Sequence, residues 1–334
     1  RTMVHMSNGV MGIAFGTAAT IVRNTVLLGY VADYSHTSVD DLDSQRVPLV
    51  FPVRNIRLKS LDQHEFKKIP GSPVAYWMSE QVMNAYGNST ALRDIAHPRQ
   101  GNTTTDNDRF VRLWWEVQSI GVGFAAHSVR EFTEKSFKWA PYNKGGGSRK
   151  WYGLNSAVVN WEDDGAEIKA IKHSVVANPH MYFVPGITWS TVSSAPKPGF
   201  RRYGSGFVFD NKGASICVDD DNLACFLLGV LNSHLLVSLV AEIAPTVSLQ
   251  PGDIAKMPIV DVSLEVRMQG VRNGELAIDI ARADWDVYER SWDFQSLPLL
   301  AVSSDSSSTL EFSYSSWITQ NRDTIAEMKR LEEE

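Results

Sequence analysis

The segment from Leu223 to Ala241 constrains the fold most, because it carries no charged side chain at neutral pH and is almost long enough to cross a bilayer. Asn232, Ser233 and His234 lie at its centre, where polar groups are least stable in lipid. The spacing of its apolar residues instead predicts a buried core helix, capped at its start by the acidic turn Asp219–Asp221. The apolar face consists of Leu223, Phe226, Leu227, Val230, Leu231, Leu235 and Leu239.

A helix of this kind needs a globular body around it. The chain has 334 residues, of which 43% are hydrophobic, and this is enough for two domains with sizeable cores. Strand patterns in FVRLWWEVQ, AVVNW, GITWST and GFVFD are interspersed with helical ones, so we expect a mixed α/β fold. Two further strands joined by a glycine-bearing turn are expected between Thr2 and Val26. Composition changes predict segments 1–95, 96–260 and 261–334.

The two cysteines, Cys217 and Cys225, are too few for a disulfide framework and lack a second pair of zinc ligands. They indicate a reducing cytoplasm. Separately, we expect no membrane partner. Neither end of the sequence shows a start or stop signal, since the last residues, MKRLEEE, continue a helical pattern. We therefore expect an internal portion of a larger protein.

A basic and aromatic stretch, Lys135–Tyr152, stands out in a chain whose formal net charge is −6. It holds five cations, five aromatic rings and three consecutive glycines but no acid. Cations bind phosphates, rings stack on bases, and glycines let a backbone approach a nucleic-acid strand. The composition therefore favours double-stranded DNA as a partner, and a solvated loop over an aromatic core is the alternative.

Specific DNA contacts can be assigned within and beyond this stretch. Lys138, Lys144, Arg149 and Lys150 are expected at phosphates or base edges, and the rings of Tyr142, Trp151 and Tyr152 are expected against a sugar or a base. Arg201 and Arg202 form a second basic cluster that would reach the opposite strand, unless they belong to an ordinary exposed turn. About six phosphate contacts would give a log–log salt slope of roughly −5.

Complete active sites are not found in the sequence. GGGSRK lacks the spacing of a phosphate-binding loop, and Asn178-Pro179-His180-Met181 lacks the second proline of an amino-methyltransferase motif. Residues 164–169, DGAEIK, imitate part of a metal-dependent nuclease site, but a solvated turn explains them better. We therefore expect no catalytic residue, no metal site and no bound cofactor within these residues.

Several stretches, read together, resemble the PglX adenine-specific DNA methyltransferases of BREX phage-defence systems. They are GNTTTDNDRFVRLWWEV (101–117), KWAPYNKGGGSRKWYGLNSAVVNWEDDGAEI (138–168), NPHMYFVPGITWS (178–190), GFVFDNKGASI (206–216), LLGVLNSHL (227–235) and DWDVYERSWDF (284–294). Thr105 stands where the family pattern G-x-x-T-G-D-N has its second glycine.

The resemblance implies a layout and a mechanism. Residues 1–95 would be the last strands of a Rossmann-type methyltransferase sheet with a linker, 96–260 a target-recognition domain, and 261–334 a helical connector. The family's S-adenosylmethionine site and catalytic Asn-Pro-Pro-Tyr would lie elsewhere in the full-length enzyme, so this portion should be inactive alone. It would hold flanking DNA while an adenine is flipped out for methylation.

A second hypothesis is an interaction scaffold that docks other BREX defence proteins without reading bases. It would use an expected aromatic helix around residues 279–292, in which Trp285, Tyr288 and Trp292 share a face, together with the acidic C-terminal tail.

Overall fold

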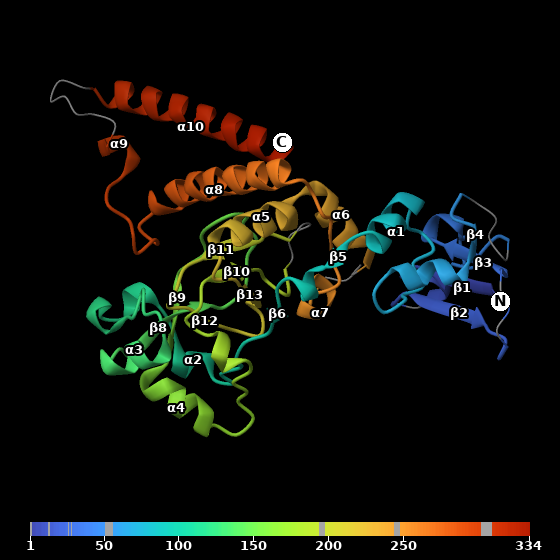
Figure 1. Ribbon diagram of the computed structural model, residues 1–334, viewed down its shortest axis with the longest axis horizontal. Coiled ribbons are helices and arrows are strands. Elements are labelled where there is room, and N and C mark those ends of the chain that lie inside the picture. The colour runs from blue at the N-terminus through green and yellow to red at the C-terminus, as the bar shows by residue number, and fades with distance from the viewer. Residues whose placement is uncertain are drawn as a thin grey trace. The chain divides into compact units, whose positions relative to one another are not determined.

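The computed structural model describes residues 2–12, 14–25, 27, 29–50, 56–193, 198–243, 248–301 and 309–334. The expected mixture of helices and small sheets is confirmed (Figure 1). The chain divides into two compact units, Arg1–Ala91 and Leu92–Glu334. This division lies near the predicted boundary after residue 95, whereas the C-terminal helices expected as a separate connector lie within the second unit. The functional roles given to the three segments stay predictions.

Unit 1 is built on a four-stranded sheet of order β2-β1-β3-β4. Its strands are β1 (Thr2–Met6), β2 (Thr17–Ile21), β3 (Val31–Thr37) and β4 (Lys59–Asp62). β1 and β2 are antiparallel, which confirms the strand pair expected near the start of the chain, and β1 and β3 are parallel. Tyr34, Phe66 and Tyr76 pack in its core, and α1 (Glu80–Gly87) and β5 (Thr90–Ala91) follow.

Unit 2 contains two four-stranded sheets. The first has the antiparallel order β11-β10-β13-β6 and consists of β6 (Pro98–Arg99), β10 (Gly186–Thr188), β11 (Arg201–Tyr203) and β13 (Ser215–Cys217). The second has the order β12-β8-β9-β7 and consists of β7 (Val111–Leu113), β8 (Trp139–Asn143), β9 (Ala157–Asn160) and β12 (Val208–Phe209). All four strand patterns identified in the sequence lie in these sheets.

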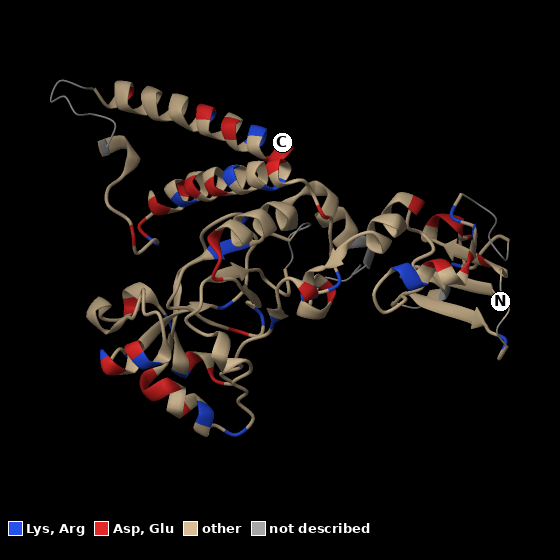
Figure 2. Cartoon of the chain, viewed as in Figure 1, with Lys and Arg blue, Asp and Glu red and all other residues tan. Residues whose placement is uncertain are grey.

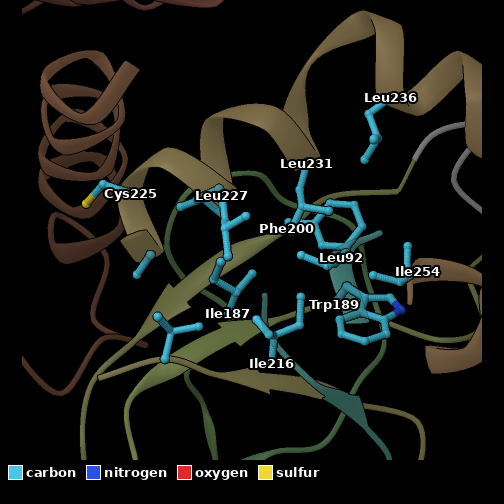
Figure 3. Packing of buried hydrophobic residues seen from close by; sticks show 14 of the residues in the cluster. Leu92, Ile187, Trp189, Phe200, Ile216, Cys225, Leu227, Leu231, Leu236 and Ile254 are labelled. Carbon is cyan, nitrogen blue, oxygen red and sulfur yellow. The ribbon is translucent and has the colours of Figure 1, made fainter. Parts of the chain in front are cut away.

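The core of the first sheet forms where helix α5 (Asp221–Asn232) packs on it. Leu227 and Leu231 of α5 meet Ile187, Phe200 and Ile216 of the sheet region, and all five side chains are fully buried (Figure 3). The Asp220 carboxylate accepts a hydrogen bond of 2.8 Å from Leu223 N, which confirms the predicted helix cap. Apolar burial on this scale is the main force that stabilises a domain of this size.

The predicted core helix is interrupted near its middle. α5 ends at Asn232, and α6 (His234–Ile243) continues after a bend of 64° at Ser233. Asn232 is buried and exchanges hydrogen bonds of 3.0 Å with the backbone of Phe200, so its polar group is satisfied at the break. Within the described ranges, no single helix has the length and hydropathy to cross a bilayer, although the bent pair passes on those two criteria.

The second sheet has its own aromatic core, formed with α2 (Asn107–Phe110), α3 (Val129–Glu134) and α4 (Glu162–Ala170). Phe132, Trp161, Phe183 and Phe209 are fully buried there. Residues 163–165 near the start of α4 have left-handed backbone angles and form a kink. The segment DGAEIK, expected to be a solvated turn, is therefore helical only after residue 165.

The C-terminal helices complete unit 2. After α7 (Pro251–Ile254) and β14 (Pro258–Ile259), α8 (Leu264–Asp286) packs along α5, and α9 (Pro298–Ala301) and α10 (Leu310–Glu333) follow. A Cβ on Gly274 would lie 2.7 Å from Cys225 O, so this glycine allows the close approach of α8 to α5. The aromatic helix predicted around residues 279–292 corresponds to the end of α8. This helix begins earlier, at Leu264, and ends at Asp286, and Trp285 is buried.

Candidate nucleic-acid interface

The most exposed part of the basic and aromatic stretch is a turn of residues 145–148, here called the glycine turn. Gly145, Gly146 and Gly147 have φ values of 78°, 94° and 70°, a backbone region that disfavours other residues. The Ser190 hydroxyl donates to Gly147 O over 2.9 Å and anchors the turn from the far side. Gly146, Gly147 and Ser148 face solvent, so a ligand can reach this backbone.

Lys144, on the strand side of the glycine turn, is held by a buried carboxylate. Its Nζ lies 2.6 Å from Asp210 Oδ2 and donates to Asn107 Oδ1 over 2.9 Å. Asp210 is only 2% exposed and also accepts bonds from the Tyr142 hydroxyl at 2.8 Å and from Lys212 N at 2.7 Å. Burial, together with the charge of Asp210, raises the pKa of Tyr142 well above its usual value. This network fixes Lys144 against the core.

The motif GNTTTDN, residues 101–107, contributes another residue to this network. Asn102 hydrogen-bonds with the Tyr142 hydroxyl, and a Cβ on Gly101 would lie 1.7 Å from Phe209 O, so only glycine fits there. Thr105, which replaces a glycine of the family pattern, has φ 61°. The turn therefore keeps the left-handed conformation that glycine favours, at some cost in backbone strain.

Arg149, on the helix side of the glycine turn, is attached to α8. Its Nη2 lies 2.5 Å from Asp284 Oδ2 and donates to Ala281 O over 3.2 Å, and its Nε donates to Tyr152 O over 2.7 Å. Arg282 lies over the Tyr152 ring at 4.9 Å, and burial raises the pKa of that tyrosine. These contacts connect the turn to a long helix of the same unit.

Lys150 and Trp151 contact the last turn of α10. Lys150 Nζ donates to Glu332 Oε1 over 2.9 Å, and Trp151 Nε1 donates to the same oxygen over 3.0 Å. The Lys150 and Glu332 side chains are 27% and 28% exposed, so this pair is far more accessible to water than Asp210.

Arg201 and Arg202 point to opposite faces of β11. Arg202 pairs with the exposed Asp221 at 2.5 Å and donates to Gly186 O over 3.0 Å. Arg201 is 4% exposed, and among the described residues nothing accepts a hydrogen bond from its Nε or Nη1. Burial, and secondly the charge of Arg149, lower the pKa of Arg201 to about 10.

The cations expected at DNA do not form a contiguous basic face. Lys138 pairs with Glu162 at 3.1 Å, Lys144, Arg149, Lys150 and Arg202 have the carboxylate partners given above, and Arg201 is buried. Basic and acidic residues are interspersed along the ribbon (Figure 2). Tyr142 and Trp151 are only 1% and 6% exposed and belong to the core, because their rings are large apolar surfaces. Because both rings are buried, we no longer expect the rings of Tyr142 and Trp151 to pack against a sugar or a base.

Other residues at this site were missed in the sequence. Asp210, Ser190, Asp284 and Glu332 contact the stretch from positions 43 to 182 residues away along the chain. The three acids were visible as charges in the sequence, but the contacts of all four residues were not, because they depend on how distant elements pack.

The residues of the imitated nuclease site are engaged elsewhere. Glu167 pairs with Arg109 at 2.9 Å, and Lys169 pairs with Asp164 at 2.5 Å. In the part of the chain that the structure describes, no three histidine, cysteine or acidic side chains are grouped so as to hold a metal ion.

Comparison with known proteins gives two strong relatives, and no family model matches the chain. The chain is 33% identical over 336 residues to the adenine-specific methyltransferase PglX of Lacticaseibacillus casei (strain Zhang) and 30% identical over 330 residues to the adenine-specific methyltransferase BrxX of Escherichia coli O9:H4 (strain HS). Each match covers 95% of this chain, which spans about a quarter of the relatives' length, 27% and 25%. The predicted resemblance is thus confirmed: by sequence, the chain corresponds over nearly its whole length to one portion of the PglX and BrxX adenine-specific methyltransferases.

Proposed function

We propose that this chain is the DNA-holding portion of a site-specific adenine methyltransferase in a BREX-type phage-defence system. The similarity to PglX and BrxX over 95% of the chain carries the proposal. In the full-length enzyme, S-adenosylmethionine would supply the methyl group and an adenine amine would receive it. The residues described above would grip the duplex next to the flipped base.

The glycine turn is the element that we place against DNA. It is exposed and open, since nothing lies within 4 Å of a Cβ built on Gly146. Lys144 and Lys150 flank it at 31% and 27% exposure, and each can offer Nζ protons to a phosphate that lies over the turn. Backbone N–H groups of exposed glycines add uncharged donors that suit phosphate oxygens.

The pairing of the cations changes the expected affinity. A lysine that exchanges a carboxylate for a phosphate gains less than a free lysine, because the pair must first be broken. We therefore expect weaker binding by this chain alone, and a log–log salt slope shallower than the roughly −5 expected from six free cations.

DNA binding is best tested by a charge at the glycine turn that spares the core. Lys144→Glu would place two carboxylates beside each other in the Asp210 network, so a loss of binding could reflect unfolding. Ser148→Glu adds a negative charge at the exposed tip instead. The matched control is Ser119→Glu, which adds the same charge at another exposed position, the first residue of the single-turn 3-10 helix Ser119–Gly121.

Fluorescence anisotropy of a labelled mixed-sequence DNA duplex would measure the result. We expect Ser148→Glu to weaken binding about tenfold, since like charges repel the phosphate, and Ser119→Glu to bind nearly as the unaltered chain does. Equal affinities for the two variants would remove the glycine turn from the interface.

An interaction scaffold is the second candidate function, and exposed apolar side chains favour it. Leu264 on α8, and Phe312 and Ile325 on α10, are 75%, 57% and 69% exposed. The aromatic face first considered for this role is not available, because Trp285 is buried and Trp292 packs against Phe124 and Phe207. Capture of another defence protein by the chain, undiminished by Ser148→Glu, would support this function.

A further inference from the structure

The contact between Lys150, Trp151 and Glu332 has the chemistry of an occupied anion site. One carboxylate oxygen, Glu332 Oε1, accepts hydrogen bonds from Lys150 Nζ at 2.9 Å and from Trp151 Nε1 at 3.0 Å. A charged and a neutral donor that converge on one oxygen are the arrangement by which proteins also hold a phosphate oxygen.

Further positive charge lies behind this site. Arg149 is paired with Asp284 and Lys150 with Glu332, whereas Arg201, whose backbone pairs with Trp151, has no acceptor for its Nε or Nη1 among the described residues. Arg201 is only 4% exposed, so it does not meet a phosphate itself, but its pKa is lowered by burial and also by the nearby charge of Arg149.

The two ends of α10 are held differently. At its start, Leu310, Phe312 and Tyr314 face solvent, whereas Leu331 and the half-buried Met328 pack into the core formed with α5 at the end that carries Glu332. The Glu332 side chain itself is 28% exposed. It can therefore turn away from Lys150 while Leu331 stays in the core and the sheets are undisturbed.

We propose that Lys150 and Trp151 form a phosphate site that Glu332 fills in this structure and vacates when DNA binds at the glycine turn. The acidic end of α10 is then an internal competitor of the DNA backbone. It lowers the affinity for any duplex, so that only DNA which also makes the remaining contacts displaces it. This inference rests on the proposed DNA-binding function, and its test separates the two.

Glu332→Gln removes the competing charge, and Glu333→Gln is the matched control. Glu333 is the next residue of the same helix, pairs with Lys329 at 3.7 Å and is 68% exposed. Both variants change the net charge equally. With a labelled DNA duplex, we expect Glu332→Gln to bind roughly two- to fivefold more tightly than Glu333→Gln, the fold-change expected for loss of one partly exposed ion pair.

Two further readouts make the expectation specific. The log–log salt slope of Glu332→Gln should be more negative than that of Glu333→Gln by about 0.9, because one more cation is free to meet a phosphate. In a Lys150→Gln background, the gain from Glu332→Gln should vanish, since the cation that it frees is no longer there.

Two outcomes distinguish the competition by α10 from the DNA-binding function. Equal affinity of Glu332→Gln and Glu333→Gln, with binding that Ser148→Glu still weakens, overturns the competition by α10 and leaves the DNA-binding function standing. No binding of duplex DNA by the chain or by any of these variants overturns both. Thermal unfolding of each variant within the range of the unaltered chain verifies that the fold is kept.

Discussion

Lys144 and Lys150 flank the same glycine turn, but the fold holds their carboxylate partners very differently. Asp210 is buried at 2% exposure and serves Tyr142, Lys144 and Lys212 at once, whereas Glu332 is 28% exposed at the end of a helix with little buried surface. The two lysines are similarly exposed, at 31% and 27%, but only the first has a buried carboxylate partner. The second can exchange its partner more readily, so the contribution of a cation to binding depends on its partner as much as on its own exposure.

The largest expected effect on stability comes from removing the buried carboxylate that holds Lys144. Asp210→Ala leaves the Lys144 charge and the Tyr142 hydroxyl without their main acceptor, and we expect a loss of about 3 kcal/mol in the free energy of unfolding. Asp284→Ala, which removes a carboxylate that is 54% exposed from Arg149, should cost less than about 1 kcal/mol. Urea denaturation of both variants measures the difference, and equal losses would show that burial does not distinguish the two pairs.

A glycine substitution tests how rigid the backbone is on the Lys144 side of the glycine turn. Gly213 lies behind the strand side of the turn, where a Cβ would come 2.0 Å from Asn143 O, and the backbone must move to accept it. We expect Gly213→Ala to lower the stability by about 1–3 kcal/mol. Gly204→Ala meets nothing within 4 Å and should be neutral or slightly stabilising. Differential scanning calorimetry would reveal the difference, and a neutral Gly213→Ala would contradict the rigidity of this side.

Arg201 permits a test in which stability and binding move in opposite directions. Arg201→Met removes a buried charge whose Nε and Nη1 have no acceptor among the described residues, so we expect unchanged stability or a gain of up to about 1 kcal/mol. The same variant should bind duplex DNA more weakly, since a positive charge near Arg149 is lost. A strong destabilisation would mean that Arg201 is held by contacts its burial does not reveal.

The smallest expected effect is a pH dependence of stability that arises in unit 1 and does not involve the glycine turn. His5 and His36 stack with ring centroids 4.6 Å apart, and burial lowers the pKa of both below 6.5. The folded state then binds fewer protons than the unfolded state, so stability is full above pH 6.5 and falls as the pH drops from 6.5 toward the lowered values. His5→Phe should flatten this fall in the melting temperature, whereas Ser148→Glu should not.

Much of the fold was predictable from the sequence. The residue patterns predicted β1 and β2 in unit 1 and β7, β9, β10 and β12 in unit 2, but not the other strands of the three large sheets. The cap at Asp220 followed from a local pattern of acids before an apolar run. The buried helix was predicted correctly, but its break at Ser233 was not, since it depends on the bonds of Asn232 to Phe200.

The candidate site was predictable only in part. The glycines of the turn and the flanking lysines stood out by composition, yet the burial of Trp151 and Arg201 and the partners Asp210 and Glu332 arise from contacts between distant segments. A cluster of cations in a sequence therefore predicts where charge is concentrated, whereas the packed structure decides how much of it faces solvent.

Hydrogen–deuterium exchange of the chain with and without duplex DNA tests the central claim most directly. The account predicts that DNA slows amide exchange in residues 145–152 and at the same time speeds it in the last turns of α10, because Glu332 leaves Lys150 as the phosphate arrives. Saturating DNA that protects other surfaces while residues 145–152 and α10 exchange as before would contradict it.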